Sequence, residues 1–319
     1  MVSDKGVMQD SGVEWIGKIP RDWRKYRIKD ISEFSPTYSS DKPKLEDACA
    51  IIPMESVSNK GELQVSKLQQ YKDVIKGLTL FENGDVIFAK ITPCMENGKG
   101  AYVETLPTQY AFGSTEFHVI RATNELSGKF LYYYTFNDAF RDYAAVNMTG
   151  AAGQKRVSTN FLKYTAIYLP EISEQQKIAE YLDHHCAKLD KVIALKQQQI
   201  KNLEALRQST IYHAVTKGLD DSVPLIDSGI EWVGNIPKSW RVNRIKDFGK
   251  VIGGFAFKSS NFCQKGTIVL KISNVSHLSL KWDDTSCLPQ SYVQAYPDYV
   301  APPHSLIFAL TRPIIKGYS

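Results

Sequence analysis

The sequence contains few cysteines and no long apolar run. Its five cysteines are scattered over 319 residues, with no Cys-x-x-Cys pair. This spacing disfavours a disulfide framework and a structural zinc site, and it fits reduced cytosolic thiols. Residues 1–12 are polar, and no apolar run approaches the length of about 18 residues that spans a bilayer. We therefore expect a cytoplasmic protein without membrane contact.

The sequence also lacks the common signatures of a catalytic site. It has no phosphate-binding Gly-x-x-x-x-Gly-Lys loop, no Gly-x-Gly-x-x-Gly after a strand, no Asn/Asp-Pro-Pro-aromatic tetrad, no His-Glu-x-x-His and no Gly-x-Ser-x-Gly. The adjacent His184 and His185 would point about 100° apart on a helix, so they could not share a metal ion. The acidic pairs at 220–221 and 283–284 lie in polar, turn-like stretches. We expect no catalytic residue, no metal site and no cofactor bound by this chain.

The composition indicates folded domains with a mild positive charge. Hydrophobic residues make up 43% and aromatic residues 11% of the chain, which argues against disorder. The net charge of +5 is compatible with a nucleic-acid partner but does not require one. The length allows two globular domains and a spacer.

One stretch, residues 173–217, contains neither proline nor glycine and predicts a single helix of about 45 residues. Ser173 and Gln176 have the spacing of a capping box, and Gly218 is placed for a C-terminal cap. Apolar residues recur in steps of three and four, with Lys196 interrupting, and this narrow stripe is close to a coiled-coil seam. We expect helix pairing through Ile178, Leu182, Leu189, Ile193, Ile200 and Leu203. The alternative is an ordinary core helix, which the length disfavours.

The chain contains an internal repeat. Residues 10–30 and 227–247 are identical at two thirds of their positions, and a fainter similarity links 87–93 with 307–313. Such a duplication predicts two related units, with the long helix at the end of the first. We expect an α+β fold divided into three parts. A first recognition domain spans residues 1–170, a long coiled-coil spacer helix spans 171–218, and an incomplete second recognition domain spans 219–319.

Short apolar runs and turn dipeptides predict the strands of both units. The strand candidates of the first unit are 48–53, 84–89, 99–103, 115–120 and 165–169, and those of the second are 267–272 and 305–310. The aromatic-rich stretch 129–146 has helical spacing and is best explained as core.

Two polar segments of the first unit suit contacts with nucleic acid. Lys and Arg side chains pair with phosphates and guanine, whereas Asn and Gln pair with adenine. The candidate DNA-binding residues are Lys90, Thr92, Asn97, Lys99, Gln154, Lys155, Arg156, Ser158 and Asn160. Both segments could also be ordinary polar loops. A basic cluster over residues 21–29 could contact phosphates or another subunit, and the sequence does not separate these roles.

The sequence resembles the specificity subunits of type I restriction-modification systems. The segments GVEWIGKIPRDW and GIEWVGNIPKSW resemble the openings of that family's target-recognition domains, and LPEISEQQKIAEYLD resembles the start of its central spacer. GDVIFAKITPCMENGKGA and TGAAGQKRVSTNFL resemble segments inside the recognition domains. The resemblance covers nearly the whole chain.

The resemblance implies a non-catalytic subunit of a complex that cleaves DNA and methylates adenine at N6. Each recognition domain would read one half of a bipartite site in double-stranded DNA, and the spacer helices would set the distance between the halves. Methyltransferase subunits carrying S-adenosylmethionine would dock on this chain. Motor-nuclease subunits would add cleavage driven by ATP with Mg²⁺.

The sequence departs from this family at its end, which corresponds to an interruption within the second recognition domain. We expect two chains to pair through their spacer helices and to read an interrupted palindrome. The segment 227–319 would then be partly unfolded or a poorly ordered appendage. Two rival hypotheses are a stand-alone DNA nuclease or methyltransferase, for which no motif is found, and a coiled-coil adaptor that does not bind DNA.

Overall fold

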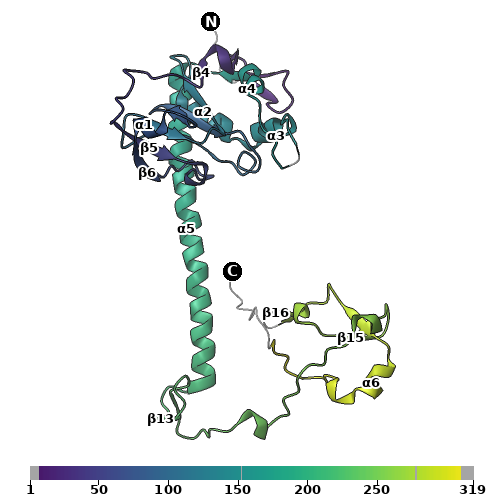
Figure 1. The fold of residues 1–319 in the computed structure, drawn as a ribbon. Helices are drawn as coiled ribbons and strands as arrows, with labels where there is room; N and C mark the ends of the chain where they lie inside the picture. Colours follow the sequence, from purple (N-terminus) through teal and green to yellow (C-terminus); the bar gives the residue numbers. More distant parts are fainter. Residues whose placement is uncertain (1–6, 152, 277–278, 310–319) are drawn as a thin grey trace. The chain divides into compact units, whose positions relative to one another are not determined.

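A computed structural model describes residues 7–151, 153–276 and 279–309 (Figure 1). The chain divides into two compact units, Met1–Leu203 and Glu204–Ser319. The predicted α+β fold with one long helix is confirmed, because unit 1 mixes sheets with short helices, and the long helix α5 (Ile172–Lys217) begins in unit 1 and continues into unit 2. No helix in the described ranges has both the length and the apolarity needed to cross a membrane.

Unit 1 is built on two four-stranded sheets. One has the order β6-β5-β10-β7, with the strands Lys67–Gln70, Ala48–Ile52, Ala111–Gly113 and Thr79–Phe81. The other has the order β4-β11-β8-β9, with the strands Ser32–Phe34, Phe117–Ala122, Asp85–Ala89 and Gly100–Tyr102. Two-stranded pairs join β1 (Met8–Asp10) to β2 (Lys18–Pro20) and β3 (Arg24–Arg27) to β12 (Ala166–Leu169). All five strands predicted for this unit are present within these bounds or close to them.

Short helices cover the second sheet. Helix α2 (Gly128–Phe136) packs against β8, β9 and β11, and α3 (Asp138–Val146) follows it. The stretch 129–146 is therefore two helices, because Asn137 leaves helical geometry and its Oδ1 accepts the Ala139 amide at 2.8 Å. Two further short helices are α1 (Tyr71–Val74) and α4 (Thr159–Tyr164). The prediction that the aromatic side chains of 129–146 belong to the core is confirmed in part: Phe130 and Phe140 are buried, Tyr132 and Tyr134 are partly buried against the core, and Tyr143 is exposed.

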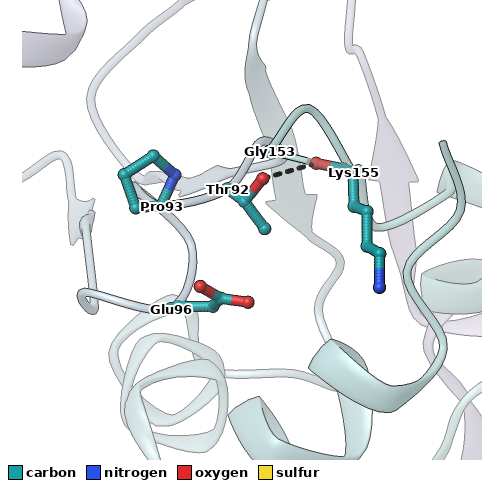
Figure 2. A pocket seen from close by; sticks show the side chains of 5 residues that line it. All are labelled: Thr92, Pro93, Glu96, Gly153 and Lys155. Atoms are coloured by element: carbon teal, nitrogen blue, oxygen red, sulfur yellow. Dashed lines mark hydrogen bonds between the residues drawn. The ribbon is translucent and has the colours of Figure 1, made fainter. Parts of the chain in front are cut away.

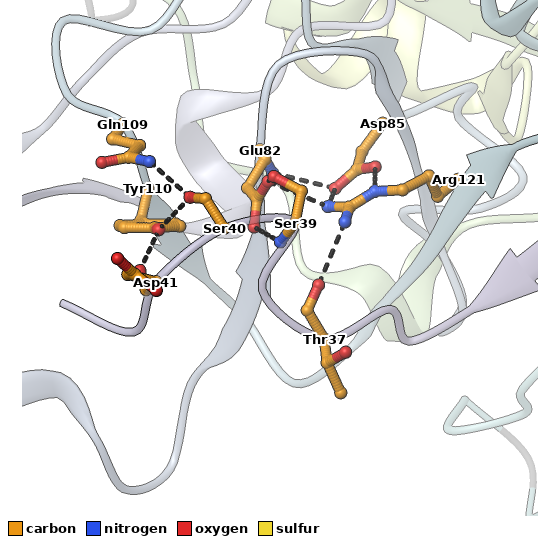
Figure 3. Close-up of polar contacts among 9 residues, drawn as sticks. All are labelled: Thr37, Ser39, Ser40, Asp41, Glu82, Asp85, Gln109, Tyr110 and Arg121. Atoms are coloured by element: carbon orange, nitrogen blue, oxygen red, sulfur yellow. Dashed lines mark hydrogen bonds and ion pairs between the residues drawn. The ribbon is translucent and has the colours of Figure 1, made fainter.

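An ion pair fixes the beginning of β8. Arg121 on β11 donates from Nε to Asp85 Oδ1 at 2.6 Å and from Nη2 to Oδ2 at 2.8 Å. The same guanidinium donates from Nη1 to the Thr37 carbonyl at 3.0 Å, and Glu82 accepts the Ser39 amide at 3.0 Å (Figure 3). Asp85 is buried, so this matched pair satisfies a charge that would otherwise be costly. The network ties the 37–39 loop to β8, the strand that leads to the candidate site.

Helix α5 begins on unit 1. It starts at Ile172, and the amides of Glu174 and Gln175 donate to the Glu171 carbonyl. The predicted capping box is therefore wrong, because Ser173 lies inside the first turn. The predicted C-terminal end is confirmed: Gly218 follows Lys217 with a φ of 85°, and its amide donates to Ala214. At 46 residues the helix is about 69 Å long.

Side chains of α5 near its start are engaged with unit 1. Ile178 packs against the buried cluster formed by Ile28, Leu131 and their neighbours. Asp183 accepts the Lys129 ammonium at 2.8 Å and the Tyr133 hydroxyl at 2.7 Å. Ile178 thus has a partner within its own chain, and the exposed part of the predicted seam begins further along.

Unit 2 has less regular structure. Its strands are β13 (Leu225–Asp227) with β14 (Asn235–Pro237), β15 (Thr267–Val269) with β18 (Ser286–Leu288), and β16 (Val275–Ser276) with β17 (Ser279–Leu280). Besides the end of α5, the described residues of this unit contain the short α-helix α6 (Ser291–Ala295). The strand predicted at 267–272 is confirmed in its first half, because Ile272 already begins a 3-10 turn. The strand predicted at 305–310 is wrong for 305–309, which have no regular structure, and residues 310–313 lie outside the described residues.

The repeated segments fold into the same hairpin. In the first copy Ser11 donates to Gly17 and Gly17 to Val13, and in the second Ser228 donates to Gly234 and Gly234 to Ile230. An aspartate carboxylate accepts a glycine amide in each copy, at 2.8 Å in the first and 2.9 Å in the second. The glycines that donate to these aspartates, Gly12 and Gly229, both have a φ of 70°, a conformation that glycine adopts without strain. The internal duplication is therefore structural as well as sequential.

Candidate nucleic-acid interface

The first of the two polar segments is the connection between β8 and β9. Its backbone turns tightly, since the Met95 amide donates to Ile91, the Asn97 amide to Pro93 and the Gly98 amide to Met95. Gly98 has a φ of 82°. Pro93, Glu96 and Asn97 are exposed at the tip, whereas Met95 is buried below it. We call residues 92–99 the β8–β9 turn.

The second segment folds back against the first. The Thr149 and Arg156 backbones exchange hydrogen bonds of 3.0 and 2.8 Å, which closes a loop over residues 149–156. Its outgoing arm is bonded to the exit of β8: the Thr92 amide donates to Lys155 at 3.0 Å, and the Val157 amide donates to Lys90 at 3.0 Å. Segments about 60 residues apart in sequence are thus joined like neighbouring strands. We call residues 149–156 the glycine loop, after Gly150 and Gly153.

A pocket lies where the two segments meet. It is lined by Thr92, Pro93, Glu96, Gly153 and Lys155 (Figure 2). The Thr92 hydroxyl donates to the Lys155 carbonyl at 3.5 Å, which leaves the lysine side chain extending away from this contact. The pocket combines a hydroxyl, a carboxylate and an ammonium group, all on parts of the backbone that are held by hydrogen bonds.

Two of the predicted cations are held by groups of the protein. Arg156 donates to both carboxylate oxygens of Glu116, from Nε at 2.9 Å and from Nη2 at 2.8 Å. The hydrogen bonds from Arg156 lower the pKa of the Glu116 carboxyl. Lys90 donates to the Thr115 carbonyl at 2.8 Å, and its partial burial lowers the pKa of its ammonium group. Both side chains can still contact a ligand, but their positions are set by β11 and the residues before it.

A buried histidine supports the glycine loop from below. His118 Nε2 lies 2.9 Å from the Val157 carbonyl, and the ring stacks beside Phe88. Burial lowers the pKa of His118 to about 4, so the ring is neutral at physiological pH. A neutral ring that donates from Nε2 satisfies the Val157 carbonyl. His118 is therefore a support of the loop, not a contact residue.

The remaining predicted residues lie at the edges of this surface. Lys99 donates to the Met54 carbonyl at 2.8 Å, so its ammonium faces the other sheet. Ser158 caps α4 by accepting the Phe161 amide at 3.1 Å, and Asn160 is exposed on that helix. The structure thus brings together Lys90, Thr92, Gln154, Lys155 and Arg156, with Asn97 at the tip of the turn. Contact of any of these residues with DNA stays a prediction.

Sequence reasoning did not find several residues that shape the surface. Glu96 lines the pocket and Glu116 orients Arg156, but a site that binds an anion gives no reason to expect acidic residues. Arg141, from α3, donates to two carbonyls of the β8–β9 turn. Its position in an aromatic helix gave no signal of this role. Within the described residues no cluster of His, Cys, Asp and Glu has the arrangement to hold a metal ion.

Comparison with known proteins identifies the family of this chain. The profile of the type I restriction modification DNA specificity domain matches residues 20–205, which include both segments and most of α5. The chain belongs to this family. The specificity subunit of the EcoAI type I restriction enzyme of Escherichia coli is 25% identical over an alignment of 373 positions, covering 94% of this chain and 63% of the relative. The MjaVIII specificity subunit of Methanocaldococcus jannaschii is 32% identical over 171 residues, covering 54% of this chain and 39% of the relative.

Solved structures of other proteins have a fold similar to that of this chain. A chain from a study of the assembly and conformational transition of the type I R-M system has a TM-score of 0.62 at 22% identity, covering 78% of this chain and 60% of that chain. The HsdS subunit of Thermoanaerobacter tengcongensis has a TM-score of 0.53 at 22% identity and the same coverage. The chain therefore spans about three fifths of the length of these relatives.

Proposed function

We propose that unit 1 is a DNA target-recognition module that reads one half of a bipartite site. The observation that carries this proposal is the backbone bonding of the glycine loop to the exit of β8, at Thr92 and Val157. It holds two polar segments side by side on one surface. The Lys155 ammonium suits phosphate or guanine, and the Gln154 and Asn97 amides suit adenine. Glu96 adds an acceptor for the amino group of cytosine.

The family supports a wider proposal for the assembly. The relatives are named as specificity subunits of type I restriction enzymes. We propose that this chain is non-catalytic and docks type I methyltransferase subunits, with motor-nuclease subunits joining them. S-adenosylmethionine, ATP and Mg²⁺ would belong to those partners. Helix α5 would set the distance between half-sites, and unit 2 would contribute to the second half.

A methylation map tests the function. The chain is co-expressed with a type I methyltransferase subunit in a host that lacks adenine methylation, and N6-methyladenine is mapped by single-molecule sequencing. A bipartite motif is expected. An asymmetric motif would assign the second half to unit 2, and an interrupted palindrome would assign it to the first unit of a second chain. If both proteins associate and no motif appears, the recognition function is refuted.

The exposed seam of α5 favours self-pairing as a second proposal. Leu189, Ile193, Ile200 and Leu203 follow one another on the helix and are between 49% and 64% exposed. Contiguous apolar surface of this kind marks an interaction site. Two copies paired through these helices would present two equal recognition units and would read an interrupted palindrome. Light scattering at micromolar concentration should give a dimer mass, and a monomer mass would exclude this arrangement.

A coiled-coil adaptor that does not contact DNA would use the same exposed seam. A DNA-binding measurement is therefore needed to distinguish an adaptor from a DNA-recognition subunit. A DNA-binding chain loses affinity steeply as salt rises, because phosphate contacts release counterions. The adaptor predicts no binding at any salt concentration. Fluorescence anisotropy with a labelled duplex between about 50 and 200 mM salt distinguishes them.

A further inference from the structure

Arg141 is a buried cation attached to the candidate interface from behind. Arg141 lies on α3 and is 6% exposed, and its side chain reaches the β8–β9 turn. Nη1 donates to the Met95 carbonyl at 2.7 Å, and Nη2 donates to the Gly98 carbonyl at 3.1 Å. One rigid, planar group therefore bridges the two ends of the exposed tip of the turn.

In the described part of the chain no carboxylate forms an ion pair with it, although the more distant Asp138 carboxylate raises its pKa. Arg121, by comparison, pairs with the Asp85 carboxylate at 2.6 Å. Arg141 instead lies over the rings of Phe88 and Phe136, at 5.2 and 5.5 Å from their centroids, and its buried Nε has no acceptor in the described residues. Burial lowers the pKa of Arg141 to about 10, so it remains charged at neutral pH.

A buried charge held only by carbonyls and aromatic faces is costly, because it gives up its hydration without an opposite charge. A structural role alone could be filled by an apolar side chain of similar volume. The two carbonyls that Arg141 binds flank Glu96 and Asn97, which are exposed at the tip. The far end of the same turn is bonded to the glycine loop through Thr92 and Lys155.

We propose that Arg141 is a positioning residue for sequence reading, which holds the tip of the β8–β9 turn so that Glu96 and Asn97 meet base edges in one orientation. The inference rests on the proposed recognition function. It assigns sequence selectivity to a residue that is buried behind the candidate interface. Loss of Arg141 would reduce selectivity and leave the number of phosphate contacts unchanged.

The test compares three variants of the full chain on a duplex selected by the wild-type protein and on an unrelated duplex. Arg141→Met removes the donors and nearly keeps the volume, and Arg141→Lys keeps the charge but replaces the bridging fork by a point donor. Phe140→Leu is the matched control, because Phe140 is fully buried one residue away on the same helix and in the cluster beneath the turn. It lowers the melting temperature without removing the bridge.

Arg141→Met should lower the selectivity ratio, which is the affinity for the selected duplex divided by the affinity for the unrelated duplex. We expect a decrease of about tenfold, the size expected for one lost bidentate base contact. Arg141→Lys should fall between it and the wild type. The dependence of log affinity on log salt should stay unchanged in both, whereas Lys155→Ala should flatten it by about 0.9 if Lys155 contacts a phosphate. Phe140→Leu should keep the selectivity ratio.

Two results overturn the inference. An Arg141→Met protein with the selectivity of Phe140→Leu would show that Arg141 is only structural, and a flattened salt dependence would show that it contacts phosphate. If Arg141→Met does not fold, an unchanged ratio in Arg141→Lys overturns the inference, because it shows that selectivity does not need the bridging guanidinium fork. A wild-type chain that selects no sequence refutes the proposed function itself, which is a different outcome.

Discussion

Replacement of Gln175 should loosen the attachment of helix α5 to the recognition unit. Gln175 is 1% exposed in the first turn of α5. Its Nε2 donates to the Glu125 and Pro170 carbonyls, both at 3.0 Å, and its Oε1 accepts the Ser127 amide at 2.9 Å. Ser127 is also the N-cap of α2, so one amide side chain joins the beginnings of two helices.

The magnitude follows from these three hydrogen bonds. A net contribution of about 1 kcal/mol each, with a larger cost where a buried partner is left unsatisfied, gives about 3–4 kcal/mol for Gln175→Leu. Burial of the leucine methyl groups returns about 1 kcal/mol. We expect a loss of about 2–3 kcal/mol in the free energy of unfolding of unit 1. Gln176→Leu is the matched control, since Gln176 is the exposed neighbour and should change stability by less than about 0.5 kcal/mol.

Hydrogen exchange with mass spectrometry is the assay, because it separates peptides of unit 1 from those of unit 2. Exchange should rise in Gln175→Leu over the beginning of α2 and the first turns of α5, and the urea midpoint of unit 1 should fall. Gln175→Glu keeps the acceptor for Ser127 but loses both donors, so it should show most of the same loss. The reasoning is refuted if Gln175→Leu and Gln176→Leu give the same exchange and the same midpoint.

Three further predictions concern other contacts. Glu116→Gln should release Arg156, raise affinity for unrelated DNA and steepen its salt dependence by about 0.9; an unchanged slope in anisotropy titrations would contradict this. Leu189→Asp should reduce self-association in sedimentation experiments, whereas Gln198→Asp on the opposite face of the helix should not, and equal masses for the two would oppose the pairing seam. The buried His118 has a pKa depressed from 6.5 to about 4, so the unfolded chain takes up a proton first as the pH falls. Stability should drop by up to about 3 kcal/mol between pH 6.5 and 4, and His118→Gln should lack that part of the drop in urea titrations.

Local sequence patterns predicted much of the fold. The end of α5 at Lys217 follows from the absence of proline and glycine up to Gly218, which is a purely local signal. The start was misplaced by one residue, because the carbonyl of Glu171 accepts the first amides in place of the Ser173 side chain. The break between α2 and α3 was missed because aromatic spacing continues through Asn137, although asparagine is a common N-cap.

The candidate site was predicted in outline but not in its supports. Polar loops with lysine, asparagine and glutamine are visible in the sequence. The contact between these loops is not, because it depends on the backbone hydrogen bond between Thr92 and Lys155. The partners Glu116 and Arg141 lie on other elements, far along the chain. A single sequence gives no signal for such pairs, because only the tertiary fold places them together.

The duplicated hairpin shows where local encoding ends. Both copies make the same turn bonds, so these short segments specify the hairpin themselves. The residues that follow have different surroundings. Ile28 is fully buried beside β12, whereas its counterpart Ile245 is 80% exposed, and in the described part of unit 2 no strand pairs with residues 241–244. Burial of such a side chain stabilises a domain by about 1.5–3 kcal/mol. The turn hydrogen bonds are therefore common to both units, whereas the burial of this side chain stabilises unit 1 alone. We expect a higher free energy of unfolding for unit 1, where the candidate interface needs a rigid support.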